Sequence, residues 1–208
     1  KLKDIKAQFL QQRARLVALQ KELDAKLAER PEAKQQIEQF VDEWKTKGLP
    51  VFQNYLQALS TAMADLPNYI ITSKDNLSVD NDTGIWTVHI SDEELNRYAR
   101  SQNKLFESFA FQFGEEGIGI TGRQGDVDAA IKGRYFIPEG VTDIIKFAID
   151  ELVFNGAKLP DTTIRSLEEQ FDLGFHMTEV KEGFFSFSFT PIDVAMDGNK
   201  LVVRLKLN

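Results

Sequence analysis

The chain contains no cysteine and only two histidines among its 208 residues. Without cysteine it has no disulfide, no thiolate metal ligand and no cysteine nucleophile. No apolar run approaches the roughly 20 residues that a membrane-spanning helix needs. The formal net charge is −7, which argues against a nucleic-acid surface as the main binding function. These features argue against cysteine chemistry, a membrane-spanning helix and nucleic-acid binding.

Sequence signatures of catalysis are also missing. The chain has no G-x-S-x-G nucleophile turn, no phosphate-binding glycine loop and no zinc-binding H-E-x-x-H. His89 and His176 each stand alone beside strand residues, so we interpret both as structural. Asp75, Asp80 and Asp82 lack the ordered ligand spacing of an EF-hand, which favours a solvated loop. We therefore predict no enzyme, no catalytic residue, no metal site and no cofactor.

Phenylalanine, by contrast, is abundant, with 16 residues. In FESFAFQF (106–113) and GFFSFSFTP (183–191) phenylalanines alternate with small and polar residues, which places them on one face of a strand. Such a stripe is either ordinary core or the lining of an apolar cavity. The candidate lining residues are Phe109, Phe111, Phe113, Ile145, Phe147, Ile149, Phe185, Phe187 and Phe189.

Residues 1–66 have a helical pattern. An a/d-type apolar repeat is formed by Leu2, Ile5, Phe9, Leu16, Leu19 and Leu23. Pro31 is expected to start a second helix, Gly48 to end it, and Pro50 to sit in the first turn of a third. The three helices form either a packing module or a coiled-coil stalk that self-associates or binds a protein partner.

Residues 67–208 are expected to form an antiparallel α+β domain. Ser91 and Glu94 form a capping box at the start of a short helix, and a second helix is predicted over Asp161–Phe171. A long strand is predicted within 142–156, with a bulge before Leu152. Further strands are expected at about 85–90, 109–122 (a hairpin), 128–137, 183–191 and 200–207. The predicted fold is α+β: a helical N-terminal segment followed by a curved antiparallel sheet packed with two helices.

In the order and style of its elements, the stretch 90–208 resembles the tubular lipid-binding superfamily, especially small bacterial envelope domains. The segments that carry the resemblance are ISDEELNRYARSQN, FAFQFGEEGIGITG, FAIDELVFNGAKLPDTTIRSLEEQF and FTPIDVAMDGNKLVVRLKLN. The resemblance implies a curved sheet wrapped on a helix, and binding of a lipid or similar amphiphile at a cell envelope. Residues 1–66 have no counterpart in that family, and they either act as a membrane-proximal spacer or fill the groove.

Our leading functional expectation is a non-enzymatic, envelope-associated protein that binds a lipid or other apolar ligand in a phenylalanine-lined cavity. The expected location is periplasmic or otherwise extracytoplasmic, with the cytoplasm as the alternative. Because the chain begins at Lys1 rather than Met, removal of an N-terminal signal, membrane anchor or tag is also expected. The alternative function is a structural or interaction module with a closed core, whose N-terminal helices bind a partner or self-associate.

Overall fold

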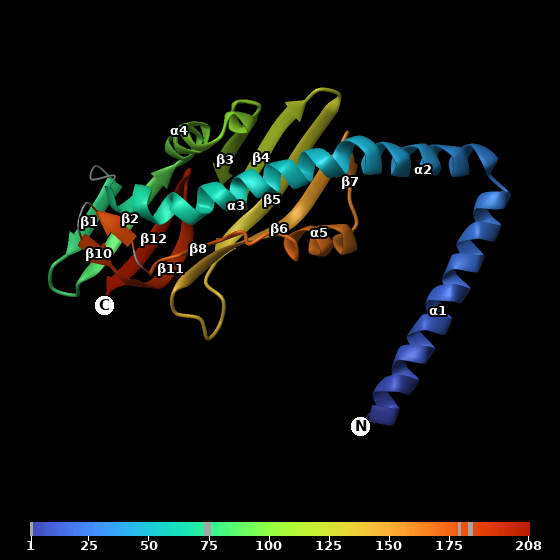
Figure 1. The fold of residues 1–208 in the computed structure, drawn as a ribbon, viewed down its shortest axis with the longest axis horizontal. Coiled ribbons are helices and arrows are strands. Elements are labelled where there is room, and N and C mark those ends of the chain that lie inside the picture. The colour runs from blue at the N-terminus through green and yellow to red at the C-terminus, as the bar shows by residue number, and fades with distance from the viewer. Residues whose placement is uncertain (1, 73–75, 179, 183–184) are drawn as a thin grey trace. The chain divides into compact units, whose positions relative to one another are not determined.

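The computed structural model describes residues 2–72, 76–178, 180–182 and 185–208, and the side chains of residues 2–12, 27, 182 and 185 lie outside this description. The chain is α+β, with an N-terminal helical segment followed by antiparallel sheets, as predicted (Figure 1). It divides into two compact units, one ending at Lys47 and one running from Gly48 to Asn208. The sequence placed a boundary near residue 66, whereas the structure groups the third long helix with the sheets.

The N-terminal unit contains α1 (Leu2–Ala28) and α2 (Pro31–Glu43). Pro31 occupies the first helical position of α2, where its missing amide leaves no hydrogen bond unmade. A π-helical turn, Trp44–Gly48, follows α2, although the sequence predicted that Gly48 would end the helix. None of the helices in the described residues is long and apolar enough to cross a membrane.

Three antiparallel sheets are formed by the described residues of the second unit. The six-stranded sheet contains β3 (Phe109–Gly114), β4 (Gly117–Gln124), β5 (Val127–Phe136), β6 (Ile144–Phe154), β7 (Ala157–Lys158) and β8 (Gly174–His176). The four-stranded sheet has the order β1 (Leu77–Asp80), β2 (Ile85–Ser91), β12 (Lys200–Leu207) and β11 (Phe189–Asp197). The remaining pair is β9 (Val180–Glu182) with β10 (Phe185–Phe187).

Helix α3 (Leu49–Thr72) is the central element of this unit, and in Figure 1 it runs across both larger sheets. Its buried face is apolar and consists of Phe52, Tyr55, Leu56, Ala58, Leu59, Ala62, Met63, Leu66, Pro67, Ile70 and Ile71. This face packs against β8 and β9 and, through Tyr55, against β3. Helix α3 therefore covers the face of the sheets on which the apolar side chains are buried.

Two shorter helices complete the packing. Helix α4 (Asp92–Gln102) packs on β3, and α5 (Asp161–Glu168) packs on β6. The predicted capping box is confirmed, since the Glu94 amide donates to Ser91 Oγ and the Ser91 amide donates to the Glu94 carboxylate at 2.9 Å. Helix α5 ends at Glu168, three residues before the predicted end at Phe171.

Two sequence predictions are corrected by tertiary packing. Helix α3 continues past Leu66 to Thr72 with Pro67 inside it, whereas the sequence predicted that the helical segment ends at residue 66. Burial of Ile70 and Ile71 explains this, because packing of an apolar face outweighs the amide that proline lacks. The described part of the segment predicted as a strand over 183–191 does not form one strand, because Phe185–Phe187 pair with β9 and the residues from Phe189 onward pair with β12.

The bulge predicted before Leu152 is confirmed. Lys132 of β5 pairs with Glu151 of β6, while its neighbour Gly133 pairs with Ile149. Asp150 is therefore the extra residue in β6, and the bulge bends the strand beneath the helix-covered face.

Candidate functional site

The nine predicted lining residues are divided between separate sheets. Of the nine, those buried on β3 and β6 are Phe109, Phe111, Ile145, Phe147 and Ile149. Phe113 is half-buried near the end of β3. Phe187 lies in β10 and Phe189 in β11, with their rings 6.3 Å apart, and the side chain of Phe185 lies outside the described residues. The described lining phenylalanines of the two segments thus belong to different sheets.

Side chains of α3 fill most of the space in front of β3. The Tyr55 ring lies 5.4 Å from the Phe106 ring and 4.4 Å from the Phe109 ring. A gap of about 10 Å³ remains in this layer, which we call the interior gap. It is lined by Leu59, Ala62, Met63, Leu66, Leu95, Tyr98, Ala99, Phe111 and Tyr135. A volume of about 10 Å³ holds one water molecule at most, so an acyl chain requires the layer to open.

A larger hollow lies where the two main sheets meet. This seam depression has a volume of about 260 Å³ and is lined by Glu115, Glu116, Gly117, Arg134, Tyr135, Val194, Ala195, Met196 and Leu201. The residues come from the β3–β4 turn, the start of β4, and strands β5, β11 and β12. Tyr135 lines both the seam depression and the interior gap. Tyr135 therefore borders both a surface hollow and the interior, and its ring centroid lies 5.2 Å from that of Phe147.

Tyrosine supplies the polar groups of this apolar interior. The chain has four tyrosines, of which Tyr55, Tyr98 and Tyr135 are buried. The Tyr98 hydroxyl donates a hydrogen bond of 2.6 Å to the Ala62 carbonyl oxygen. The buried hydroxyl of Tyr55 has no hydrogen-bond partner among the described residues. Burial raises the pKa of all three phenols, so they remain protonated donors at neutral pH.

No sequence motif surrounds these three tyrosines. None of Tyr55, Tyr98 and Tyr135 is among the residues for which the sequence predicts a function. Their one sequence signal is periodicity: Tyr135 occupies a buried position in a strand whose next residue, Phe136, is exposed. That pattern indicates that the side chain is buried, but it does not show whether the tyrosine hydroxyl has a hydrogen-bond partner.

An open trough of about 500 Å³ lies elsewhere on the surface. Its lining consists of Gln112, Phe113, Gly114, Glu116, Gly117, Ile118, Gly119, Lys132, Gly133, Asp150, Glu151 and Lys158. Lys158 Nζ lies 2.8 Å from Glu151 Oε2, and this contact lowers the pKa of Glu151 and raises that of Lys158. Arg134 likewise pairs with Asp150 at 2.7 Å. Charges of both signs thus neutralise one another here, and the trough has no single electrostatic preference.

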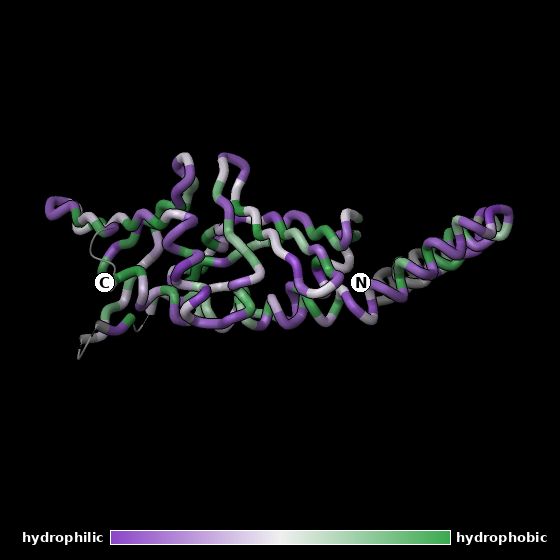
Figure 2. Tube along the Cα trace, turned by 90° about the horizontal axis from the view of Figure 1, so that it is seen from above, coloured by the Kyte–Doolittle hydropathy of each residue, from purple (hydrophilic) through white to green (hydrophobic). Residues whose placement is uncertain are grey.

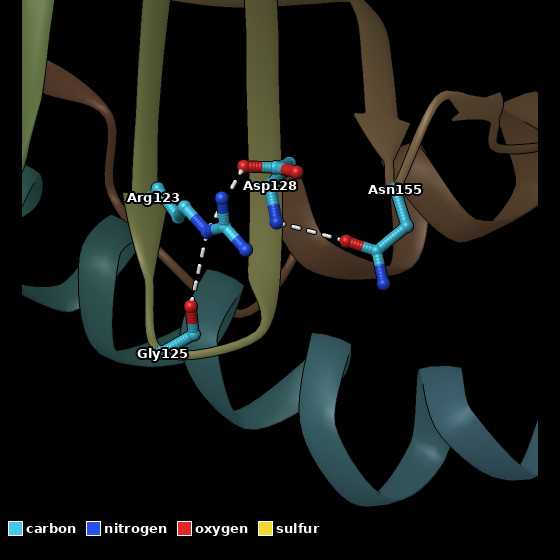
Figure 3. Close-up of polar contacts among 4 residues, drawn as sticks. All are labelled: Arg123, Gly125, Asp128 and Asn155. Atoms are coloured by element: carbon cyan, nitrogen blue, oxygen red, sulfur yellow. Dashed lines mark hydrogen bonds and ion pairs between the residues drawn. The ribbon is translucent and has the colours of Figure 1, made fainter.

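The polar cluster at the ends of the β4–β5 and β6–β7 hairpins is structural (Figure 3). Arg123 Nε donates to the Gly125 carbonyl at 3.2 Å and lies 3.5 Å from Asp128 Oδ1. The Asp128 backbone amide donates to Asn155 Oδ1 at 2.8 Å, and the Asn155 backbone amide donates to the Asp128 backbone carbonyl at 2.9 Å. These bonds tie two neighbouring turns together at the edge of the sheet.

Other polar residues noted in the sequence have local partners. The Asp80 carboxylate accepts hydrogen bonds from the Thr83 hydroxyl and the Asp82 amide, which lower its pKa and hold the β1–β2 turn. Asp75 lies outside the described residues. His176 Nδ1 lies 3.8 Å from Asp143 Oδ2 on a half-exposed surface. Groups of His, Asp and Glu side chains suited to holding a metal ion were not found within the described residues.

No protein-family model matches this chain, and comparison with curated proteins and with solved structures gave no match. Its function is therefore inferred from the geometry.

Proposed function

We propose that the unit Gly48–Asn208 is a non-enzymatic module that binds a lipid or another apolar ligand at a cell envelope. The ligand lies between α3 and the phenylalanine-bearing face of the six-stranded sheet. The observation that supports this proposal is the position of Tyr135, which lines the interior gap on one side and the seam depression on the other. The envelope location rests on the resemblance of residues 90–208 to tubular lipid-binding domains.

Opening at the seam requires movement of the buried Tyr135 side chain, whose ring packs on those of Phe147 and Phe175. The four-stranded and six-stranded sheets are separate hydrogen-bonded ladders, so displacing Tyr135 leaves both ladders intact. The layer behind it contains small side chains, Ala62 and Ala99, and the adaptable side chain of Met63. Each ligand methylene buried there contributes about 0.8 kcal/mol, so an acyl chain offsets the loss of the α3 packing that it displaces.

Native mass spectrometry of the purified chain, with organic extraction of the same sample, tests this function. A discrete extra mass that matches an extracted lipid is expected. If the apo mass alone appears, and incubation with vesicles of dioleoylphosphatidylglycerol adds nothing, the layer is only a core and the proposal is wrong.

A second candidate function, self-association through α1, is favoured by one observation. Leu16, Leu19 and Leu23 follow heptad spacing and are 66%, 55% and 50% exposed. Figure 2 shows hydrophobic and hydrophilic residues alternating along the N-terminal helices. Such a stripe suits the same stripe of a second copy in a two-stranded coiled coil.

Light scattering of the full chain tests the second candidate. We expect a dimer that Leu19→Lys converts to a monomer, whereas Gln20→Lys, at the adjacent exposed position, leaves the dimer unchanged. A monomeric wild-type chain at every concentration contradicts self-association.

A further inference from the structure

We propose that Tyr55 selects ligands that carry a hydrogen-bond acceptor, specifically the carbonyl of an acyl ester, by donating its hydroxyl to that oxygen inside the apolar layer. This inference rests on the proposed binding function and specifies the ligand class. It makes Tyr55 a specificity residue of the module.

The first support is the state of the Tyr55 hydroxyl. The side chain is 1% exposed, and its oxygen has no hydrogen-bond partner among the described residues. Buried polar groups in proteins are almost always hydrogen-bonded, because leaving one unpaired costs free energy of folding. Tyr98 shows the usual arrangement in the same layer, since its hydroxyl donates to the Ala62 carbonyl. Tyr55 is thus a donor held in the interior without an acceptor.

The second support is the place of Tyr55 in the layer. It lies four residues before Leu59 on α3, so the two side chains share one helix face, and Leu59 lines the interior gap. Its ring packs on Phe109, one of the predicted lining residues. Burial and then the neighbouring Tyr135 phenol raise the pKa of Tyr55, which keeps its hydroxyl protonated. A ligand that enters past Tyr135 thus reaches an apolar layer in which the Tyr55 hydroxyl is a donor without an acceptor among the described residues.

Ligand chemistry follows from that donor. An ester carbonyl accepts a hydrogen bond and brings no donor of its own, so it satisfies Tyr55 and leaves nothing else unpaired. A free carboxylate would bring a buried charge, which the apolar layer disfavours. A pure hydrocarbon has no acceptor, so it would leave the Tyr55 hydroxyl without a hydrogen bond.

Displacement of the dye N-phenyl-1-naphthylamine from the full chain tests the inference, with methyl palmitate and heptadecane as matched probes. We expect Tyr55→Phe to weaken methyl palmitate binding by about tenfold, as for one hydrogen bond, and to leave heptadecane binding unchanged. Tyr69→Phe, which removes a hydroxyl from a half-buried tyrosine on the same helix, is the control and changes neither.

Equal weakening of both probes by Tyr55→Phe shows a packing role and overturns the inference, as does no effect on either. Neither of these outcomes touches the proposed function, because the wild-type chain still binds. Failure of both probes to bind wild type overturns the proposed function and the inference together.

Thermal melting without ligand gives an independent measurement. Because the hydroxyl is unpaired, Tyr55→Phe is expected to keep or raise the melting temperature. A clear fall below that of Tyr69→Phe shows that the hydroxyl has a partner within the protein, and it overturns the inference.

Discussion

At the scale of single residues, Gly133 shows how the bulge in β6 constrains the sequence of β5. A Cβ built on Gly133 meets the carbonyl oxygen of Ala148 and the ring of Phe147. Both of these groups belong to β6, the strand that contains the extra residue Asp150. The position therefore requires the absence of a side chain, so that Phe147 can pack in the core.

Gly133→Ala is expected to lower the free energy of unfolding by about 2 kcal/mol, because the backbone oxygen has no room to move away. Urea denaturation measures the change. Gly114→Ala is the control, since a Cβ there meets nothing within 4 Å and the unfolding free energy should change by no more than about 0.5 kcal/mol. Equal effects of the two substitutions contradict this explanation.

At the scale of elements, α4 depends on a carboxylate at its start. Burial alone would raise the pKa of Glu94, but the Ser91 amide, the side chains of Asn76 and Ser91 and the charge of Arg97 together lower it below its ordinary value of 4.5. A lowered pKa means that the folded state binds this proton less readily than the unfolded state. Its contribution to stability is therefore present above pH 4.5 and is lost as the pH falls through the lower, folded-state pKa.

Glu94→Gln is expected to reduce the acid sensitivity of folding below pH 4.5 and to cost about 1 kcal/mol near neutral pH, as for loss of a helix cap. Chemical denaturation across a pH series measures both effects. Glu93→Gln, one residue earlier and exposed, provides the control. If both variants follow the wild-type pH profile, the capping carboxylate is not the acid-sensitive group.

Helix α3 offers a matched test of the interior gap. Ala62 lines the gap, whereas Ala64 on the same helix is exposed. Ala62→Leu is expected to fill the gap and abolish lipid uptake in vesicle incubation, and Ala64→Leu should leave it unchanged. Overpacking by leucine costs about 1 to 3 kcal/mol, so the smaller Ala62→Val is measured beside it, with melting curves for each. Full uptake by a folded Ala62 variant contradicts a ligand position beside α3.

At the scale of the whole molecule, the division at Lys47 separates two kinds of helix. Helix α3 has a buried apolar face that the sheets require, while Leu16, Leu19 and Leu23 of α1 are exposed. The unit Gly48–Asn208 contains its own core. We therefore expect the unit Gly48–Asn208 to fold without residues 1–47.

Deletion of residues 1–47 is therefore expected to leave a folded protein with the wild-type melting temperature, measured by circular dichroism. It should also yield a monomer by light scattering. Deletion of residues 1–66, the boundary expected from the sequence, should leave an unfolded chain, because it removes most of α3. If the variant that lacks residues 1–47 melts several degrees below the wild type, the two units are not independent.

Local features of this protein were predictable from the sequence. The capping box of Ser91 and Glu94 acts within one helical turn, and the bulge at Asp150 interrupts a two-residue period in a single strand. The burial of Phe109, Phe111 and Phe147 also follows from alternation. Each of these depends on neighbours a few residues away, which a sequence pattern records directly.

Only the tertiary structure decided which buried faces meet. It extended α3 through Pro67, assigned that helix to the sheets, and placed Phe187 and Phe189 in strands with different partners. Among the described residues it also left the Tyr55 hydroxyl without a hydrogen-bond partner, while the Tyr98 hydroxyl donates to the Ala62 carbonyl. These outcomes depend on contacts between residues far apart in the chain, where the total apolar area buried outweighs local preference. A sequence pattern shows that a side chain is buried, but the fold determines what it is buried against.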